Sequence, residues 1–267
     1  MDGLINKKIF LLDMDGTIYL ENTLFEGVVE FLQFLKANNL KYLFLTNNSS
    51  KSVVAYIEKL NKMGIKATKD DFMTSSMATA AYLKNFHLKD NIYLVGTKSL
   101  KEELESVGLS IYDELNDEIN CLVVGYDTEL NYKKIEEATK LLIKGVPYIA
   151  TNPDLVCPMS YGYLPDCGSF CQMFKNATGR TPKVIGKPET YMIDAALDKY
   201  GYKKEQALLV GDRIYTDIAS GNKANISTAI VLTGESTRED VLNSDLRFDY
   251  VLNHIMELYE ALKKIYK

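Results

Sequence analysis

The amino-acid sequence predicts an α/β fold in which a mostly parallel sheet carries an inserted second α/β section. Three observations support this prediction. Apolar residues alternate along the chain between short strand-like runs and helical spacing, which is typical of βα units. Acidic or small polar residues follow several of the strand-like runs. The middle of the chain repeats the alternation on its own and is therefore expected to form a separate section.

The first part of the chain predicts two strand–helix units. Residues 9–12 are expected to form a buried strand, and helical spacing follows over residues 28–35. A second strand is expected over residues 42–45, with a helix over residues 53–63 after it.

The last part of the chain continues the same pattern. Strands are expected over residues 184–185, 207–210, 228–232 and 250–252, and a closing amphipathic helix over residues 255–265. We expect these strands to join those of the first part in one sheet.

The middle section predicts its own sheet. Residues 92–95, 121–124 and 148–150 form strand-like runs, and residues 132–144 have the apolar spacing of a helix. We place this section at residues 81–181, inserted into a core that is formed by residues 1–80 and 182–267.

Composition and charge exclude several classes of protein. The 267 residues are 46% hydrophobic and 25% charged, which excludes disordered and low-complexity chains. A net charge of −5 without any cluster of basic residues disfavours a nucleic-acid partner. No apolar run approaches the ~18 residues of a membrane span, and no secretory signal is expected. Four cysteines in this setting are typical of reduced thiols, so we predict a cytoplasmic protein that binds no membrane.

The strongest local signal is the segment Asp13-Met14-Asp15-Gly16-Thr17, directly after the first predicted strand. Ligands of open α/β sheets bind outside the carboxyl ends of the strands. Two carboxylates at such a place could bind a hard cation, with one acting as nucleophile and the other as proton donor. The alternative is that Asp and Gly are only turn residues after a strand.

Small polar residues follow the second strand in the segment Thr46-Asn47-Asn48-Ser49-Ser50. Hydroxyls, side-chain amides and free backbone N–H groups before a helix can bind an anion such as phosphate. An ordinary helix N-cap is the alternative.

Gly186-Lys187-Pro188 follows the short strand at residues 184–185. It is not a P-loop, because Thr181 stands where that motif needs Gly and Pro188 where it needs Ser or Thr. A solvated lysine is the simplest interpretation, but its place at a strand end favours a fixed cation that faces the same crevice.

Two further acids, Asp212 and Asp217, follow the strand at residues 207–210. Asp212 is placed to join Asp13 around a cation, whereas for Asp217 a helix-capping role competes with a metal role. Together the strand ends predict a divalent metal, a nucleophile and a phosphate clamp.

These segments resemble the four motifs of the haloacid dehalogenase superfamily, in its order and over nearly the whole chain. LLDMDGT resembles the first motif, LFLTNN the second, VIGKP the third and VGDRIYTD the fourth. Residues 74–83 and 149–154, together with the long insertion, further resemble the NagD-like branch. The resemblance implies a Rossmann-like, doubly wound parallel-sheet core with an inserted α/β cap domain of the C2 type.

The resemblance also implies roles for the acids. Asp13 would attack phosphorus and form an aspartyl-phosphate, and Asp15 would protonate the leaving alcohol and then activate water. Mg²⁺ would be held by Asp13, the backbone carbonyl of Asp15 and Asp212, with support from Asp217.

The same resemblance implies that Thr46 and Lys187, assisted by the backbone of Asn47, hold the phosphoryl oxygens. It also makes the inserted section a cap over the active site. The segment 151–168 of that section is rich in turn formers and aromatics, and we expect it, including Asn152, to contact the leaving group.

The sequence therefore predicts a Mg²⁺-dependent phosphomonoesterase that acts on small phosphorylated metabolites, such as nucleotide monophosphates or sugar phosphates. One alternative is a phosphotransferase or phosphomutase that uses the same intermediate. A phospho-accepting signalling domain or a non-hydrolytic ligand-binding module is another. The resemblance further suggests a homodimer.

Overall fold

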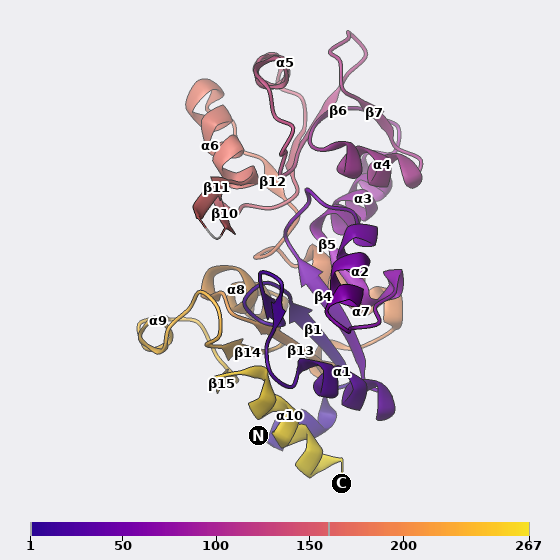
Figure 1. Cartoon of the computed structure of the whole chain (residues 1–267). Coiled ribbons are helices and arrows are strands. Elements are labelled where there is room, and N and C mark those ends of the chain that lie inside the picture. Colours follow the sequence, from indigo (N-terminus) through magenta and orange to yellow (C-terminus); the bar gives the residue numbers. More distant parts are fainter. Residues whose placement is uncertain (1, 160, 267) are drawn as a thin grey trace. The chain divides into compact units, whose positions relative to one another are not determined.

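The structure is a computed structural model that describes residues 2–159 and 161–266. The chain forms two compact units (Figure 1). The first unit consists of Met1–Thr46, Val54–Met73 and Lys187–Lys267, and the second of Asn47–Val53 and Thr74–Gly186.

The first unit is built on a six-stranded sheet with the strand order β15-β14-β13-β1-β4-β5. All pairs from β15 to β4 are parallel, as predicted. The apolar residues of β1 are fully buried, as expected of a strand that is covered on both faces. The strands are β1 (Ile9–Asp13), β4 (Lys41–Thr46), β5 (Phe72–Thr74), β13 (Ala207–Gly211), β14 (Ser227–Val231) and β15 (Tyr250–Leu252).

Helices follow these strands along the chain. In Figure 1, α1 and α10 lie side by side, and Phe31 and Phe34 of α1 contact the ring of Tyr259 on α10. The predicted helices are confirmed within two residues at each end. The helices are α1 (Val28–Ala37), α2 (Val53–Lys62), α7 (Tyr191–Tyr200), α8 (Ala219–Ala224), α9 (Arg238–Leu242) and α10 (Ile255–Ile265).

Short elements complete the first unit. A small antiparallel hairpin follows β1, and single turns precede several strands. These elements are η1 (Asp2–Asn6), β2 (Tyr19–Leu20), β3 (Thr23–Leu24), η2 (Lys69–Asp71), η3 (Lys204–Gln206) and the π-helical turn η4 (Ile214–Ile218).

The second unit has a five-stranded parallel sheet with the order β12-β9-β8-β6-β7. Apolar residues of α5 and α6 pack with those of the sheet in one core. Helix α5 has the predicted bounds, because Asn131 caps its start and Gly145 caps its end. The elements are α3 (Ser75–Phe86), β6 (Asn91–Val95), α4 (Lys98–Ser106), β7 (Ser110–Tyr112), β8 (Cys121–Val124), α5 (Tyr132–Lys144), β9 (Tyr148–Ala150), α6 (Cys167–Thr178) and β12 (Lys183–Val184).

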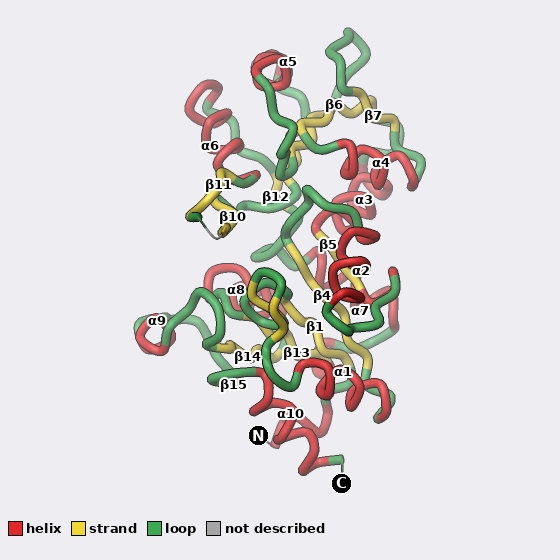
Figure 2. The backbone as a smooth tube through the Cα atoms, in the orientation of Figure 1, coloured by secondary structure: helices red, strands yellow, loops and turns green. Residues whose placement is uncertain are grey.

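The segment 151–168, which is rich in turn formers, nevertheless contains regular structure. An antiparallel hairpin joins β10 (Val156–Met159) to β11 (Gly162–Pro165), and α6 begins at Cys167 (Figure 2). The spacing of apolar residues does not predict this hairpin, because each strand has only four residues and one of the four is a proline.

The boundaries of the two units differ by several residues from the predicted ones at 80/81 and 181/182. Helix α3 lies wholly in the second unit, whose longer segment begins at Thr74, the residue that caps the helix by accepting a hydrogen bond from the amide of Met77. Its neighbour is α4 of the same unit. At the other boundary, β12 pairs with β9, which keeps the chain in the second unit up to Gly186. A strand of two residues leaves no periodicity from which to predict this pairing.

Within residues 2–159 and 161–266, no helix combines the length and the apolar character that crossing a membrane requires.

Candidate active site

Three of the predicted site residues stand at the carboxyl edge of the large sheet. In the register of β1 with β4, Asp13 lies opposite Leu45, so Thr46 is the next residue at this edge. On the other side of β1, strand β13 ends at Gly211, and Asp212 follows directly. Parallel pairing therefore brings Asp13, Thr46 and Asp212 to one edge, as the sequence predicted.

The structure brings three carboxylates together around one lysine. Oxygen atoms of Asp13, Asp212 and Asp217 all lie within 4.8 Å of one another. Lys187 Nζ donates to Asp13 Oδ1 at 2.5 Å and to Asp217 Oδ1 at 2.7 Å. Only 13% of the Asp13 side chain and 3% of the Lys187 side chain are exposed, and Asp217 is fully buried. The lysine of the third motif is thus a fixed cation and not a solvated surface charge.

Burial shifts the pKa values of two of the three acids Asp13, Asp212 and Asp217, which we call the acid cluster. It raises the pKa of Asp13 well above the ordinary range, although Lys187 opposes the shift. Burial, reinforced by the negative charge of Asp217, raises the pKa of Asp212 to about 6. Burial would lower the pKa of Lys187, but Asp13 and Asp217 outweigh it, and the pKa is raised. The Lys187 ammonium and the Arg213 guanidinium, whose charge opposes the rise in the pKa of Asp13 and Asp212, therefore face three acids.

The donor set of the cluster fits Mg²⁺, which prefers carboxylate and carbonyl oxygens. Asp212 Oδ1 is buried and has no hydrogen-bond partner among the residues that the structure describes. Its other oxygen, Oδ2, accepts a hydrogen bond from the amide of Glu235 at 2.7 Å. A cation beside Asp212 Oδ1 would satisfy that atom and offset the surplus negative charge.

Asp217 has both of its oxygens engaged. Oδ1 accepts from Lys187, and Oδ2 accepts from the backbone amide of Arg213 at 3.1 Å. The carboxylate lies within the turn η4 and bonds back to the residue before it. Asp217 therefore ties down the turn and contacts Lys187, and its role in supporting a metal stays a prediction.

Asp15 lies in a more open environment than the three buried acids. Its side chain is 48% exposed. The hydroxyl of Tyr19 donates to Asp15 Oδ2 at 3.3 Å, and Lys59 Nζ is 3.9 Å from Oδ1. The Lys59 ammonium also lies 3.7 Å from the centroid of the Tyr19 ring. Asp15 therefore has access to solvent and can exchange protons.

Gly16 is required by the turn that separates Asp15 from the next element. Its backbone φ of 88° lies in the left-handed region, which residues with a side chain rarely adopt. A Cβ atom at this position would also collide with the carboxylate of Asp212. The glycine of the first motif thus lets the backbone approach the acid cluster.

Asn47 and Asn48, which we expect to assist phosphate binding, belong to the second unit. Asn48 Oδ1 accepts hydrogen bonds from the amide and the hydroxyl of Ser50, at 3.0 Å and 2.7 Å. Asn47 Nδ2 donates to Asp154 Oδ2 at 2.7 Å. Helix α2 begins only at Val53, so the polar run of the second motif is not its immediate N-cap.

Asn152 also belongs to the second unit and is fully buried there. Its Nδ2 donates to Asp154 Oδ2 at 2.9 Å and to Asp166 Oδ1 at 3.1 Å. Its Oδ1 accepts from the hydroxyl of Thr151 at 2.8 Å. These bonds engage the amide within the unit, and its expected contact with a leaving group stays a prediction.

The loop after β14 contributes residues that the sequence analysis missed. The amide of Glu235 holds Asp212 Oδ2, and the Glu235 carboxylate pairs with Arg213 at 3.0 Å. The hydroxyl of Thr233 donates to the carbonyl of Gly16 at 2.6 Å. This loop is another polar, glycine-containing segment directly after a strand, the same signal that identified the other motifs.

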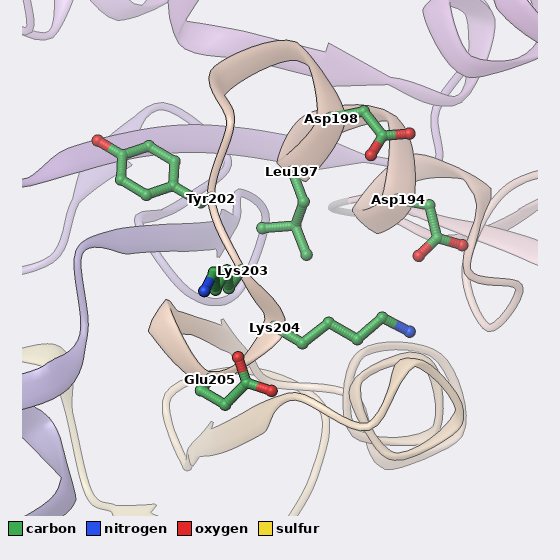
Figure 3. A pocket seen from close by; sticks show the side chains of 7 residues that line it. All are labelled: Asp194, Leu197, Asp198, Tyr202, Lys203, Lys204 and Glu205. Atoms are coloured by element: carbon green, nitrogen blue, oxygen red, sulfur yellow. The ribbon is translucent and has the colours of Figure 1, made fainter.

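A separate pocket of the first unit lies away from these acids. Figure 3 shows its lining of mixed charge, which comes from the end of α7 and from η3. Because η3 immediately precedes β13 whereas Asp212 follows it, this pocket is at the opposite end of that strand. The lining residues are Asp194, Leu197, Asp198, Tyr202, Lys203, Lys204 and Glu205.

Comparisons with known proteins give the chain a family. Residues 10–110 match the haloacid dehalogenase-like hydrolases, and residues 184–258 match a second group described as like these hydrolases. The acid sugar phosphatase of Staphylococcus epidermidis is 36% identical over 255 residues, which cover 96% of this chain and 98% of that one.

Solved structures agree with this result. A 4-nitrophenylphosphatase from Thermotoga maritima superposes with a TM-score of 0.93 at 39% identity, covering 97% of this chain and 99% of that one. A structure described as a putative nagD protein superposes with a TM-score of 0.89 at 37% identity, covering 96% of this chain and 98% of that one. A glycerol phosphate phosphatase from Mycobacterium tuberculosis in complex with magnesium superposes with a TM-score of 0.90 at 29% identity, covering 96% of this chain and 78% of that one. The chain therefore belongs to the haloacid dehalogenase-like hydrolases, in their NagD-like branch.

Proposed function

We propose that the chain is a Mg²⁺-dependent phosphatase that hydrolyses small phosphate monoesters, sugar phosphates foremost, through an aspartyl-phosphate on Asp13. The observation that carries this proposal is the arrangement of Asp13 at the sheet edge. Its carboxylate lies 2.5 Å from the buried Lys187 and within 4.8 Å of the oxygens of Asp212 and Asp217. A nucleophile, a fixed cation and a set of oxygen ligands thus occupy one place.

Asp13, Asp212 and the backbone carbonyl of Asp15 would hold Mg²⁺, with support from Asp217. When bound, the ion supplies positive charge that offsets the carboxylates and the phosphoryl oxygens. Lys187 and Thr46 bind the phosphoryl group at the same edge of the sheet. The Lys187 ammonium stabilises the charge that spreads over the equatorial oxygens in the transition state.

The reaction takes two displacements at phosphorus. A carboxylate oxygen of Asp13 attacks, the bond from phosphorus to the leaving oxygen breaks, and Asp15 gives that oxygen a proton. Asp15 then takes a proton from water, whose oxygen attacks the phosphorus of the aspartyl-phosphate. The bond from phosphorus to Asp13 breaks, which releases inorganic phosphate and restores the carboxylate. The exposure of Asp15 suits this exchange of protons.

The named activities of the relatives support the substrate class. They include an acid sugar phosphatase at 36% identity and a glycerol phosphate phosphatase at 29%. Sugar phosphates and similar small phosphorylated alcohols therefore rank above nucleotide monophosphates as candidates. In this proposal the second unit is the cap domain, and its segment 151–168 contacts the leaving group.

Two further expectations belong to this proposal. One is a cytoplasmic location, which reduced thiols at the four cysteines would fit. A homodimer remains a prediction of the family resemblance, and light scattering tests it.

The test is phosphate release from a panel of sugar phosphates, nucleotide monophosphates and an aryl phosphate, with Mg²⁺ and with chelator. We expect release that needs Mg²⁺, is highest with a sugar phosphate and disappears in the Asp13→Asn variant. If wild-type protein released phosphate from none of these esters, or released it equally in chelator, the proposal would be wrong.

A further inference from the structure

A buried polar cluster in the second unit anchors the residues that lie next to Thr46 and Lys187 in the chain. We call it the Asp154 cluster. All its residues are at most 8% exposed, although every one of them is polar or charged. Its members are Asn47, Ser75, Thr151, Asn152, Asp154 and Asp166, all in the second unit.

One oxygen of Asp154 joins two loops that are far apart in the sequence. Asp154 Oδ2 accepts from Asn47 Nδ2 at 2.7 Å and from Asn152 Nδ2 at 2.9 Å. The second amide hydrogen of Asn152 reaches Asp166, whose carboxylate caps α6 through the amide of Cys167. The loop after β4 is thereby tied to the loop after β9 and to a helix start.

Asn47 is fixed at a second point. Its carbonyl accepts a hydrogen bond from the Ser75 hydroxyl at 2.6 Å. Both the side chain and the backbone of Asn47 are therefore held, which leaves its peptide unit little freedom to rotate. This residue directly follows Thr46, the last residue of β4.

Gly186 is held by the same cluster. Its amide donates to the carbonyl of Thr151 at 2.8 Å. A Cβ atom at Gly186 would lie 2.6 Å from that carbonyl oxygen and 2.7 Å from Asn47 Oδ1. Only a glycine fits so close to both groups, and Lys187 is the next residue.

We propose that Asp154 is a positioning residue for phosphate binding, because it fixes Asn47 and thereby the chain at Thr46 and, through Thr151, at Lys187. This inference rests on the proposed function, in which Thr46 and Lys187 hold the phosphoryl oxygens. No role in the reaction itself is assigned to Asp154. It acts by restricting the backbone from which the phosphate ligands extend, and displacements of about 1 Å can lower a rate about 100-fold.

The test compares Asp154→Ala and the milder Asp154→Asn with Asp71→Asn as a matched control. Asp71 is 7% exposed, as is Asp154, and its carboxylate also accepts hydrogen bonds, two from Thr68 and one from Lys41. Steady-state kinetics with a sugar phosphate, calorimetric binding of inorganic phosphate and thermal unfolding are measured for each variant. We expect Asp154→Ala to lower kcat/KM up to about 100-fold and to weaken phosphate binding, with a smaller loss for Asp154→Asn. Asp71→Asn should lower the unfolding temperature without changing either functional value.

A double-mutant cycle with Asn47→Ala tests whether Asp154 acts through Asn47. If it does, the double variant loses no more kcat/KM than the more affected single variant, because both substitutions remove the same constraint. Losses that multiply, or an Asp154→Ala variant with wild-type kcat/KM and phosphate binding, would overturn this inference while the wild type remains an active phosphatase. A wild type that releases no phosphate would instead overturn the proposed function.

Discussion

Replacing Asp212 by asparagine should stabilise the metal-free protein while it removes activity. The pKa of Asp212 is raised from its ordinary value of 3.8 to about 6 because the carboxyl is buried beside Asp217. Each pKa unit corresponds to about 1.4 kcal/mol, so above pH 6 the charged form costs about 3 kcal/mol of folding free energy. Asparagine has a similar shape but carries no charge, and its amide group can donate to the neighbouring carboxylates.

The effect has a definite pH dependence. Below about pH 4 the Asp212 carboxyl is protonated in both the folded and the unfolded chain, and its charge costs nothing. The cost appears as the pH rises from about 4, where only the unfolded chain ionises, and is complete above about 6. Asp212→Asn should therefore match the wild type near pH 4 and exceed its free energy of unfolding by about 3 kcal/mol at pH 8.

Urea unfolding in chelator at pH 4 and pH 8, followed by circular dichroism, measures this difference. Asp240→Asn is the control, because hydrogen bonds from Thr237 lower the pKa of Asp240 and its loss should destabilise the protein at pH 8. In excess Mg²⁺ the wild type should gain about 2.7 kcal/mol of stability at a hundred times the dissociation constant, whereas Asp212→Asn, which lacks a ligand, should gain none. An Asp212→Asn variant that is no more stable than wild type at pH 8, or that keeps the same advantage at pH 4, would refute the reasoning.

Three other predictions follow from the acid cluster. Lys187→Met should lower kcat about 100- to 1,000-fold, because the developing charge on the phosphoryl oxygens loses a fixed cation; unchanged steady-state kinetics would exclude this role. Gly16→Ala should destabilise the protein by at least about 1 kcal/mol in urea, because alanine disfavours a φ of 88° and its Cβ collides with Asp212; equal stability would contradict the turn geometry. Mg²⁺ affinity should fall as the pH drops below about 6, where Asp212 takes up a proton that the ion must displace; calorimetric titrations that give one affinity at pH 5 and pH 7.5 would disagree.

The sequence predicted the acid cluster because its residues follow buried parallel strands. An apolar run of four or five residues ends at Asp13 and another ends just before Asp212, and parallel pairing aligns such ends at one edge. The same reasoning predicted strands of the large sheet, because their apolar runs are long enough to be recognised in the sequence. Lys187 was assigned from the short strand before it, which was expected in the large sheet but pairs with β9 in the second unit.

Other features depend on tertiary contacts that leave no local pattern. The bond between Asp217 and Lys187 spans 30 residues and requires the π-helical turn, which no spacing of apolar residues encodes. The boundary at Gly186 depends on the two-residue strand β12. The burial of Asn152 depends on Asp154 and Asp166, the second of which belongs to the start of α6. In each case a polar side chain is placed by partners from distant segments.

The most direct test of the mechanism is to trap the phosphoryl group on the protein. An Asp15→Asn variant, which lacks both the acid for the leaving group and the base that activates water, is mixed with a labelled aryl phosphate and Mg²⁺ and quenched in acid, because an aryl oxide leaves without a proton. Peptide mass spectrometry then locates the label. The account predicts a phosphoryl group on Asp13, and none in the Asp13→Asn variant. Label on another residue, or an Asp13→Asn variant that still hydrolyses the ester, would contradict it.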